Sequence, residues 1–237
     1  MKIGLLQCDD VAEALQPRHG NYPHLFQQAF SQVGSEVEWQ VFRCHDGEIP
    51  QQINELDGWV ISGSRHGVYD NLPWIDELGA FIRQCWQQRR PVVGICFGHQ
   101  LLAQALGGTV KPHPQGWGIG VSFNQIVESR AWMQPSQDGL EILVSHQDQV
   151  VNLPSMGQVL AASQFCRNYM VEYDGVMLGI QGHPEFTRDY ARDLMQYRQS
   201  VLPPNRVREA LHSLSAPLDD RLVLAWIVNF LSQHHLR

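Results

Sequence analysis

One short run restricts the fold of this chain more than any other part of the sequence. Residues 91–98 read Pro-Val-Val-Gly-Ile-Cys-Phe-Gly, so an apolar segment leads into a cysteine flanked by two glycines. A continuously apolar segment of this length is typical of a parallel strand buried on both faces. Residues 98–106 then predict a short helix, because two glycines follow it and glycine commonly ends helices. The run predicts a buried strand, a tight turn at Cys96 and a helix.

A cysteine on such a turn is well placed to act as a nucleophile. A sharp strand-to-helix turn presents its side chain, and glycines two residues to either side let neighbouring chain pass close by. The helix N-terminus carries a partial positive charge that favours a thiolate. The alternative is a buried structural cysteine on a core strand, which is the commoner fate of an isolated cysteine. Both glycines in register favour a nucleophilic role for Cys96.

A second motif ends a later apolar β run, where residues 179–186 read Gly-Ile-Gln-Gly-His-Pro-Glu-Phe. Pro184 favours an extended conformation at His183, and residues i and i+2 of an extended chain point the same way. Glu185 can therefore reach the imidazole ring, fix its tautomer and stabilise the imidazolium. The alternative is a surface turn without function.

A metal site is another alternative for these residues, with His146 or His99 as further ligands. No HxxxH or similar ligand spacing is present in the sequence, although metal sites usually show such spacing. There is also no G-x-x-x-x-G-K-[ST] phosphate-binding loop. We therefore expect no metal and no cofactor.

The remainder of the chain predicts a single α/β domain. The first two thirds alternate apolar strands with helical patterns, which indicates a mostly parallel central sheet flanked by helices. Residues 109–181 then show β-type runs broken by proline and glycine, which indicate added antiparallel strands. Strands are expected at 2–7, 37–42, 58–61, 91–95, 118–127, 140–144, 158–162, 169–173 and 176–181, and helices at 22–33, 73–88, 98–106, 188–199, 207–213 and 218–231.

Composition narrows the class of partner and the compartment. The 237 residues carry a net charge of −7 without a Lys/Arg cluster, which argues against nucleic acid or an anionic membrane as partner. Small neutral or zwitterionic substrates fit better. The N-terminus lacks the apolar core of a signal peptide, and the longest fully apolar run, residues 222–228, is far shorter than a membrane span. The five cysteines form no CxxC pair, so we expect reduced thiols and a cytoplasmic protein.

Together, the two motifs resemble those of the class I, or triad, glutamine amidotransferases, in particular the amidotransferase domain of GMP synthase. The resemblance covers residues 1–190 and implies a flavodoxin-like domain, with residues 191–237 as a helical extension packed on the same domain. It also implies that Cys96 attacks the side-chain amide of glutamine, that ammonia departs, and that the glutamyl thioester is hydrolysed. His183 would then be the general base and acid, with Glu185 as the residue that orients it.

Further stretches resemble the family's substrate site. Gln100 matches the glutamine of the family's Cys-x-Gly-x-Gln run, which implies a role in holding the amino acid end of the substrate. Residues 61–65 stand where the family has a Ser-Gly-Gly-Pro-like loop, which implies that the oxyanion hole uses backbone N–H groups of Gly63 or Ser64 together with Phe97. Ser64 and Arg65 replace the Gly-Pro of that loop.

Residues 144–150 resemble the family's Ser-His-Gly-Asp segment, which lines the glutamine pocket. The resemblance implies substrate contacts from Ser145, His146 and Gln147. Gln147 stands where glycine is usual, so the shape of the pocket is expected to differ.

Two other functions stay open. A γ-glutamyl peptidase or hydrolase would use the same triad on other γ-glutamyl amides without a synthetase partner, and residues 62–75 look similar to stand-alone members of the family. A binding or regulatory module without activity is the second alternative, and the intact triad argues against it. An amidotransferase would pass its ammonia to a separate synthetase or acceptor chain, because no acceptor domain is recognised in this sequence.

Overall fold

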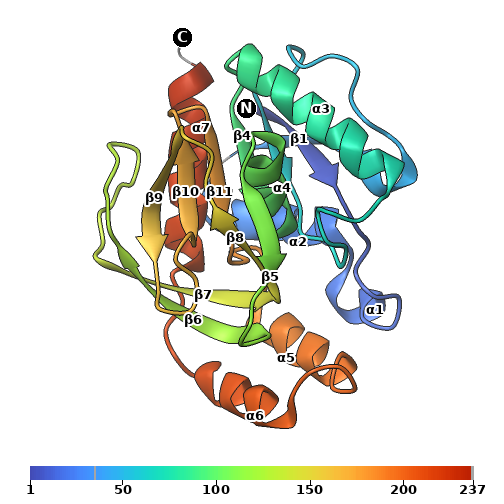
Figure 1. Ribbon diagram of the computed structural model, residues 1–237, viewed down its shortest axis with the longest axis vertical. Coiled ribbons are helices and arrows are strands. Elements are labelled where there is room, and N and C mark those ends of the chain that lie inside the picture. The colour runs from blue at the N-terminus through green and yellow to red at the C-terminus, as the bar shows by residue number, and fades with distance from the viewer. Residues whose placement is uncertain (35, 236–237) are drawn as a thin grey trace.

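The fold is built around one large mixed sheet (Figure 1). The computed structural model describes residues 1–34 and 36–235. Within them, nine strands form this sheet in the order β2-β1-β3-β4-β11-β10-β9-β6-β7, and β5 pairs with β8 in a separate two-stranded sheet. The strands are β1 (Lys2–Gln7), β2 (Glu38–Arg43), β3 (Gly58–Ile61), β4 (Val92–Ile95), β5 (Thr109–Pro112), β6 (Gly118–Ile126), β7 (Gly139–His146), β8 (Asp148–Asn152), β9 (Gly157–Ala162), β10 (Met170–Tyr173) and β11 (Met177–Ile180).

Strand direction divides the sheet into two halves. The pairs from β2 through β1, β3 and β4 to β11 are parallel. From β11 onward, β10, β9, β6 and β7 are joined by antiparallel pairs. The carboxyl ends of parallel strands meet at one edge of a sheet, where open α/β sheets bind their ligands. Cys96 follows β4 at this edge, and His183 lies three residues beyond β11.

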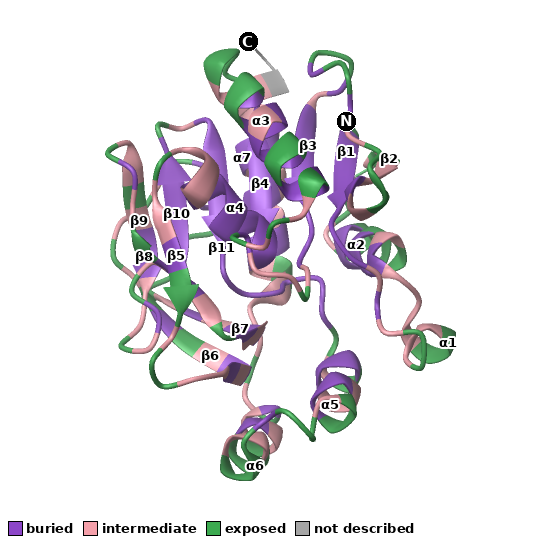
Figure 2. Cartoon of the chain, turned by 45° about the vertical axis from the view of Figure 1, so that its right-hand side comes forward, coloured by how far each residue is buried: buried purple, intermediate pink, exposed green. Residues whose placement is uncertain are grey.

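Helices cover both faces of the parallel half. The helices of the described chain are α1 (Gln16–His19), α2 (Tyr22–Ser31), α3 (Pro73–Gln87), α4 (Phe97–Ala105), α5 (Arg188–Tyr197), α6 (Pro204–Ser213) and α7 (Asp220–His235), with a short 3₁₀ turn at Cys44–Asp46. Side chains alternate along the strands, so Val60 and Val93 join the core under α2 and α7, whereas Trp59 and Val92 join the core under α3 and α4. Figure 2 shows the central strands almost wholly buried between these layers.

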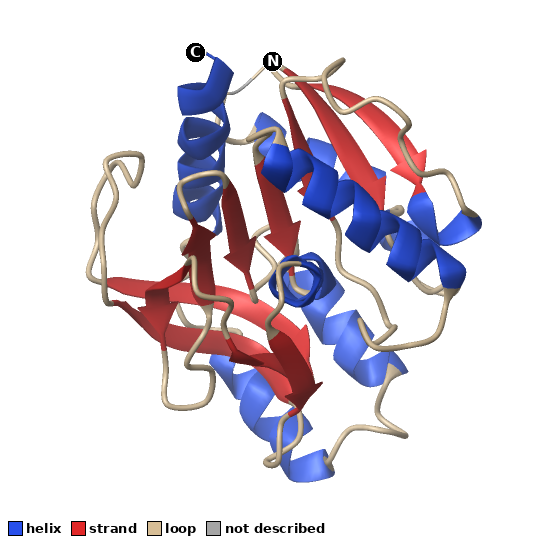
Figure 3. Ribbon diagram, turned by 45° about the horizontal axis from the view of Figure 1, so that its top comes forward, coloured by secondary structure: helices blue, strands red, loops and turns tan. Residues whose placement is uncertain are grey.

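The antiparallel half carries the other C-terminal helices. In Figure 3 the antiparallel strands curve away from the parallel ones, and Figure 1 shows α5 and α6 below β6 and β7. The Oγ atom of Ser213, at the end of α6, accepts a hydrogen bond from the backbone N–H of Val121 on β6 at 2.9 Å. None of the described helices is long and apolar enough to cross a membrane.

The α/β class predicted from the sequence is confirmed, and every predicted strand and helix has a counterpart within a few residues of its expected ends. The structure adds α1, the 3₁₀ turn, β5 and β8. Within the described part of the chain the two strands pair only with each other, at a bulged register, and β5 is partly exposed. They therefore lack the continuous apolar pattern that reveals a buried strand.

Helix α4 packs unusually close to the sheet because glycines line the contact. A methyl group at Gly94 would lie 2.4 Å from the carbonyl carbon and oxygen of Gly98. A methyl group at Gly98 would in turn lie 2.7 Å from the carbonyl oxygen of Ile61 on β3. Real Cβ contacts are not this short. The two glycines that flank Cys96 therefore allow the backbone of α4 to lie directly against the backbone of the sheet.

This contact predicts whether one substitution raises or lowers the free energy of unfolding. Inside an ordinary helix, Gly→Ala stabilises by about 1 kcal/mol. We expect Gly98→Ala to destabilise instead, by about 1–3 kcal/mol, because the added methyl overpacks against β3. Chemical denaturation of the variant measures this. Gly139→Ala is the control, because the nearest atom to its added methyl would be 3.8 Å away. A Gly98→Ala protein as stable as the parent would contradict the close packing.

Candidate active site

Cys96 lies on a strained turn between β4 and α4. Its backbone has φ 51° and ψ −100°, a conformation that residues with side chains rarely adopt. The turn is held from both sides: the N–H of Cys96 donates to the carbonyl of Ile180 at 2.8 Å, and its carbonyl accepts from the N–H of Gln100 at 3.1 Å. The side chain thus projects from the N-terminus of α4 into a pocket, as the motif predicts.

His183 and Glu185 lie together beneath this turn. The Nδ1 atom of His183 is 2.7 Å from Oε1 of Glu185, and both side chains are almost wholly buried. The ring of Phe186 stacks on the imidazole with centroids 3.9 Å apart and planes 9° apart. The backbone N–H of His183 donates to the carbonyl of Leu143 at 2.8 Å. Ring and backbone are therefore both fixed.

The charge state of His183 depends on two neighbours. Burial alone would lower the pKa of the imidazole, but the charges of Glu185 and Cys96, together with hydrogen bonding to both, raise that pKa to about 10. The Cys96 sulfur is therefore close enough to interact with the ring. A buried imidazole held between a carboxylate and a cysteine sulfur is the arrangement that can activate a cysteine as a nucleophile.

The loop after β3 closes the site on another side. A methyl group at Gly63 would lie 2.8 Å from Cε1 of His183, so the absence of a side chain at Gly63 makes room for the ring. Within the part of the chain that the structure describes, the backbone N–H groups of Gly63, Ser64 and Phe97 have no hydrogen-bond acceptor. Of these three predicted oxyanion residues, Ser64 lines the pocket that contains Cys96.

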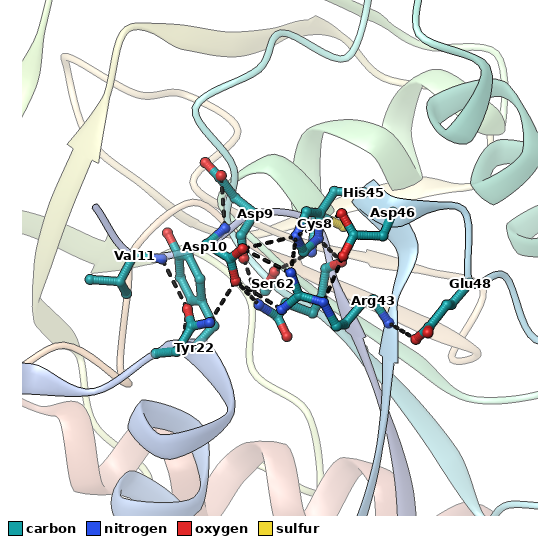
Figure 4. Close-up of polar contacts among 12 residues, drawn as sticks. Cys8, Asp9, Asp10, Val11, Tyr22, Arg43, His45, Asp46, Glu48 and Ser62 are labelled. Carbon is teal, nitrogen blue, oxygen red and sulfur yellow. Dashed lines mark hydrogen bonds and ion pairs between the residues drawn. The ribbon is translucent and has the colours of Figure 1, made fainter. Parts of the chain in front are cut away.

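Asp9, which follows β1, holds this loop in place. Its carboxylate accepts from the backbone N–H of Arg65 at 2.8 Å and forms an ion pair with the Arg65 guanidinium, also at 2.8 Å. The neighbouring Asp10 is held in turn by Arg43 at 2.9 Å, with His45 beside them (Figure 4). The Arg43 guanidinium holds the pKa of Asp10 well below its usual range. Asp9 thus ties the end of β1 to the loop after β3, and Asp10 ties it to the end of β2.

Gln181 was given no role by the sequence reasoning. Its side-chain Nε2 lies 3.6 Å from the sulfur of Cys96. Its Oε1 accepts from Nε2 of Gln100, which also donates to the carbonyl of Asp148 at 2.8 Å. Gln181 lies two residues before His183 in the motif, so the same i, i+2 reasoning that placed Glu185 could have indicated Gln181.

A pocket of about 400 Å³ opens above Cys96. The predicted residues Ser64, Gln100, Ser145, His146 and Gln147 line it, together with residues that the sequence reasoning did not assign: Arg65, His66, Gly67, Tyr69, Asp70, Trp117, Asp148, Arg198 and Val201. Side chains of both charges therefore face one pocket. Asp148 lies in the Ser-His-Gly-Asp-like segment and residues 65–70 lie in the stretch that resembles stand-alone members, whereas Trp117, Arg198 and Val201 are distant in sequence and were given no role.

His146 is uncharged in this pocket. Burial lowers the pKa of its imidazole to about 4. Its Nδ1 donates to the carbonyl of Asp148 at 3.0 Å, which leaves Nε2 as an acceptor. Among the described residues, no group of three or more His, Cys, Asp or Glu side chains is arranged to hold a metal ion.

The chain is similar to known proteins along most of its length. The family model described as glutamine amidotransferase class-I matches residues 19–197. Gamma-glutamyl peptidase 4 of Arabidopsis thaliana is 33% identical over 192 residues, covering 78% of this chain and 75% of that protein. One of the subunits of the glutamine-hydrolysing GMP synthase of Sulfolobus acidocaldarius is 30% identical over 169 residues, covering 70% and 85%. The crystal structure of a glutamine amidotransferase from Methylobacillus flagellatus aligns with TM-score 0.76 and 22% identity, covering 98% and 94%.

The charge arrangement predicts how His183 titrates. We expect its ring to stay protonated at neutral pH and to lose the proton only as the pH rises toward about 10. Glu185→Gln should lower this pKa, because it removes the adjacent negative charge. NMR titration of the imidazole measures both values, with the exposed Glu38→Gln as control. A His183 ring that titrates at its ordinary value near 6.5 in the parent would contradict the arrangement.

The same shift has a consequence for stability. Because the pKa of His183 is higher in the folded state than its ordinary 6.5, the protonated ring stabilises the folded protein. That contribution is complete below about pH 6.5 and is lost as the pH rises through about 10. The free energy of unfolding of Glu185→Gln should therefore fall less steeply over this range than that of the parent.

Proposed function

Because the chain belongs to the class I glutamine amidotransferase family, we propose that it hydrolyses the side-chain amide of glutamine through a glutamyl thioester and releases ammonia for transfer. The observation that carries this proposal is the His183–Glu185 pair at 2.7 Å, whose imidazolium faces the Cys96 sulfur. In this proposal Cys96 is the nucleophile, His183 the general acid and base, and Glu185 the residue that orients the imidazole.

In the proposed reaction Cys96 and His183 act in both steps, the formation of the thioester and its hydrolysis. The Cys96 thiolate attacks the amide carbon, and the oxygen that becomes negative accepts hydrogen bonds from the free N–H groups of the Gly63 loop and Phe97. His183 gives its proton to the nitrogen, ammonia leaves and the thioester forms. His183 then takes a proton from water, whose oxygen attacks the thioester, and glutamate leaves as Cys96 is restored as thiolate. The sum is glutamine plus water to glutamate plus ammonia.

A second candidate function is supported by three observations. A γ-glutamyl peptidase would hydrolyse γ-glutamyl amides larger than glutamine, and a pocket of about 400 Å³ is within the usual range for drug-sized ligands. The loop that carries the oxyanion donors is tied to Asp9 without any partner chain. Gamma-glutamyl peptidase 4 of Arabidopsis thaliana is also among the relatives. Both candidates share the triad and the thioester and differ in the leaving amine.

The proposal extends to partners, compartment and domain organisation. An amidotransferase of this kind would pass ammonia to a separate synthetase, as the similarity to a GMP synthase subunit of Sulfolobus acidocaldarius suggests. The five buried cysteines are all free thiols, which supports a cytoplasmic location. We place the C-terminal helices in the same domain as the sheet, because residues of α5 and α7 share one core with β1, β3 and β4.

A substrate panel tests the proposed function. We expect the pure protein to release glutamate and ammonia in equal amounts from glutamine. Cys96→Ala should reduce turnover by more than about 10³-fold, because no other group can form the thioester. Cys166→Ala is the control, as another buried free cysteine. A glutamine-analogue electrophile should label Cys96 alone.

The panel also includes glutathione and other γ-glutamyl peptides. Hydrolysis of these peptides without hydrolysis of glutamine would establish the second candidate in place of the first. No hydrolysis of any γ-glutamyl amide, or an adduct mapped to a different cysteine, would refute both.

The contact between Asp9 and Arg65 yields a separate prediction. Asp9→Asn weakens the tie to Arg65, so the oxyanion donors become less well placed. We expect kcat to fall by about 10-fold or more, up to the roughly 10²-fold that the loss of one such donor costs, with KM little changed. Asp174→Asn is the control, because it removes a surface ion pair to Arg89 of the same length, 2.8 Å. An unchanged kcat in Asp9→Asn would show that the contact with Arg65 does not determine the position of the loop after β3.

A further inference from the structure

Two guanidinium groups line the pocket above Cys96, and among the described residues only one of them, that of Arg65, has a carboxylate partner. Arg65 pairs with the carboxylate of Asp9 at 2.8 Å. Within residues 1–34 and 36–235, no carboxylate lies within ion-pair distance of Arg198. Its side-chain contacts are Ser145, whose Oγ accepts from Nη1 at 3.2 Å, and the ring of Trp117, whose centroid is 5.9 Å from the guanidinium carbon.

These contacts hold the Arg198 side chain in place without using up its charge. A hydroxyl accepts one hydrogen bond, and an aromatic face orients the guanidinium plane, so most of its five N–H donors remain free. A planar fork of free N–H groups is suited to a carboxylate, which it can bind through two parallel hydrogen bonds. Arg65 could do the same only by releasing Asp9.

Backbone hydrogen bonds hold Arg198 at the C-terminus of α5. Helix α5 begins at Arg188, three residues after Glu185, and ends at Tyr197, with Arg198 as its C-cap residue. The N–H of Arg198 donates to the carbonyl of Leu194 at 3.0 Å, and its own carbonyl accepts from Leu202 at 3.1 Å. The buried face of α5, including Tyr190 and Leu194, packs into the core. Arg198 and Glu185 are therefore joined by a packed helix and not by a loose loop.

The negative groups of the pocket come from other elements. Asp70 lies on the loop after β3, and Asp148 begins β8, where its carboxylate accepts from the hydroxyl of Tyr69 at 2.8 Å. A pocket with carboxylates from one set of elements and an unpaired guanidinium from another suits a ligand with both charges. Every γ-glutamyl compound with a free α-amino and α-carboxylate group is such a ligand.

We propose that Arg198 is a specificity-determining residue that binds a carboxylate of the γ-glutamyl substrate, so that the pocket selects anionic or zwitterionic amides over neutral ones. This inference rests on the proposed function of the same pocket. A γ-glutamyl peptide offers two carboxylates, the α-carboxylate of the glutamyl group and the terminal carboxylate of the leaving amine. Glutamine offers only the first.

Three synthetic substrates separate these two sources. γ-Glutamylglycine has both carboxylates, γ-glutamyl methylamide has only the α-carboxylate, and 4-aminobutanoylglycine has only the one on the leaving amine. Steady-state kinetics compare Arg198→Gln and Arg198→Lys with the parent. Arg192→Gln is the matched control, because Arg192 lies on α5, the helix that Arg198 caps, but pairs with Asp189 outside the pocket.

We expect Arg198→Gln to raise KM for γ-glutamylglycine by about 10- to 100-fold, the usual value of a hydrogen bond to a charged group, with a smaller change in kcat. Arg198→Lys should restore part of the loss, because it keeps the charge and loses the fork. The rise in KM should persist for one of the two single-carboxylate substrates, and that substrate identifies which carboxylate Arg198 binds. Either result supports the proposal. Equal effects on all three substrates, or a fall in kcat with KM unchanged, would overturn it.

A binding measurement separates this inference from the proposed function. Calorimetry with Cys96→Ala and with Cys96→Ala/Arg198→Gln follows the binding of γ-glutamylglycine without turnover. Weaker binding to the double variant supports Arg198 as the carboxylate receptor even if the parent proves unable to hydrolyse the compound. Equal binding to both proteins would overturn the inference whatever the enzyme activity. Matching thermal unfolding of the variants establishes that they are folded.

Discussion

The close contact of α4 with β3 and β4 is the constraint on which the rest of the structure depends. A side chain at Gly94 or Gly98 would overlap neighbouring backbone, so the strand and the helix approach to a distance that only glycine permits. The chain between them must then reverse within one residue, and Cys96 adopts a positive φ to do so. Strain of this kind costs about 1–3 kcal/mol and persists only where surrounding contacts impose it. Here the hydrogen bond to Ile180 and the buried face of α4 impose it.

A buried histidine with a raised pKa is stable in this position only because opposite charges surround it. A buried imidazolium alone would be costly, and desolvation does lower the pKa of His183, but Glu185 and Cys96 more than offset that effect. The remaining contacts determine orientation. Phe186 stacks on one face of the ring, and Gly63 leaves space beside Cε1. The glycine of the proposed oxyanion loop therefore serves the ring as well as the loop.

The sequence predicts those features whose determinants are local. The elbow at Cys96 is contained in eight consecutive residues, and the His183–Glu185 contact follows from the geometry of an extended chain. The α/β class follows from apolar strands that alternate with helical patterns, and the elements appear close to their expected ends. The catalytic roles of these residues remain proposals, but their proximity was foreseeable from the order of residues.

Features that join distant segments were not foreseeable in this way. Asp9 meets Arg65 across 56 residues, and Arg198 meets Ser145 across 53. Neither pair has a spacing or periodicity that a single sequence reveals, because the pairing depends on which strands become neighbours in the sheet. Strands β5 and β8 were missed for a related reason, since their ladder is short, bulged and partly exposed.

The Asp9–Arg65 tie bears on how such an enzyme would be controlled. An amidotransferase that works with a synthetase avoids wasting ammonia if its oxyanion donors are misplaced until the partner docks. In this chain the backbone N–H and the guanidinium of Arg65 both bind one buried carboxylate, so moving the loop would leave a buried charge without its cationic partner. Breaking such a pair is costly, which favours a loop that keeps one position. Selectivity would then depend on which substrate the pocket accepts, and Arg198, which lines the same pocket as Cys96, is the group best suited to that discrimination.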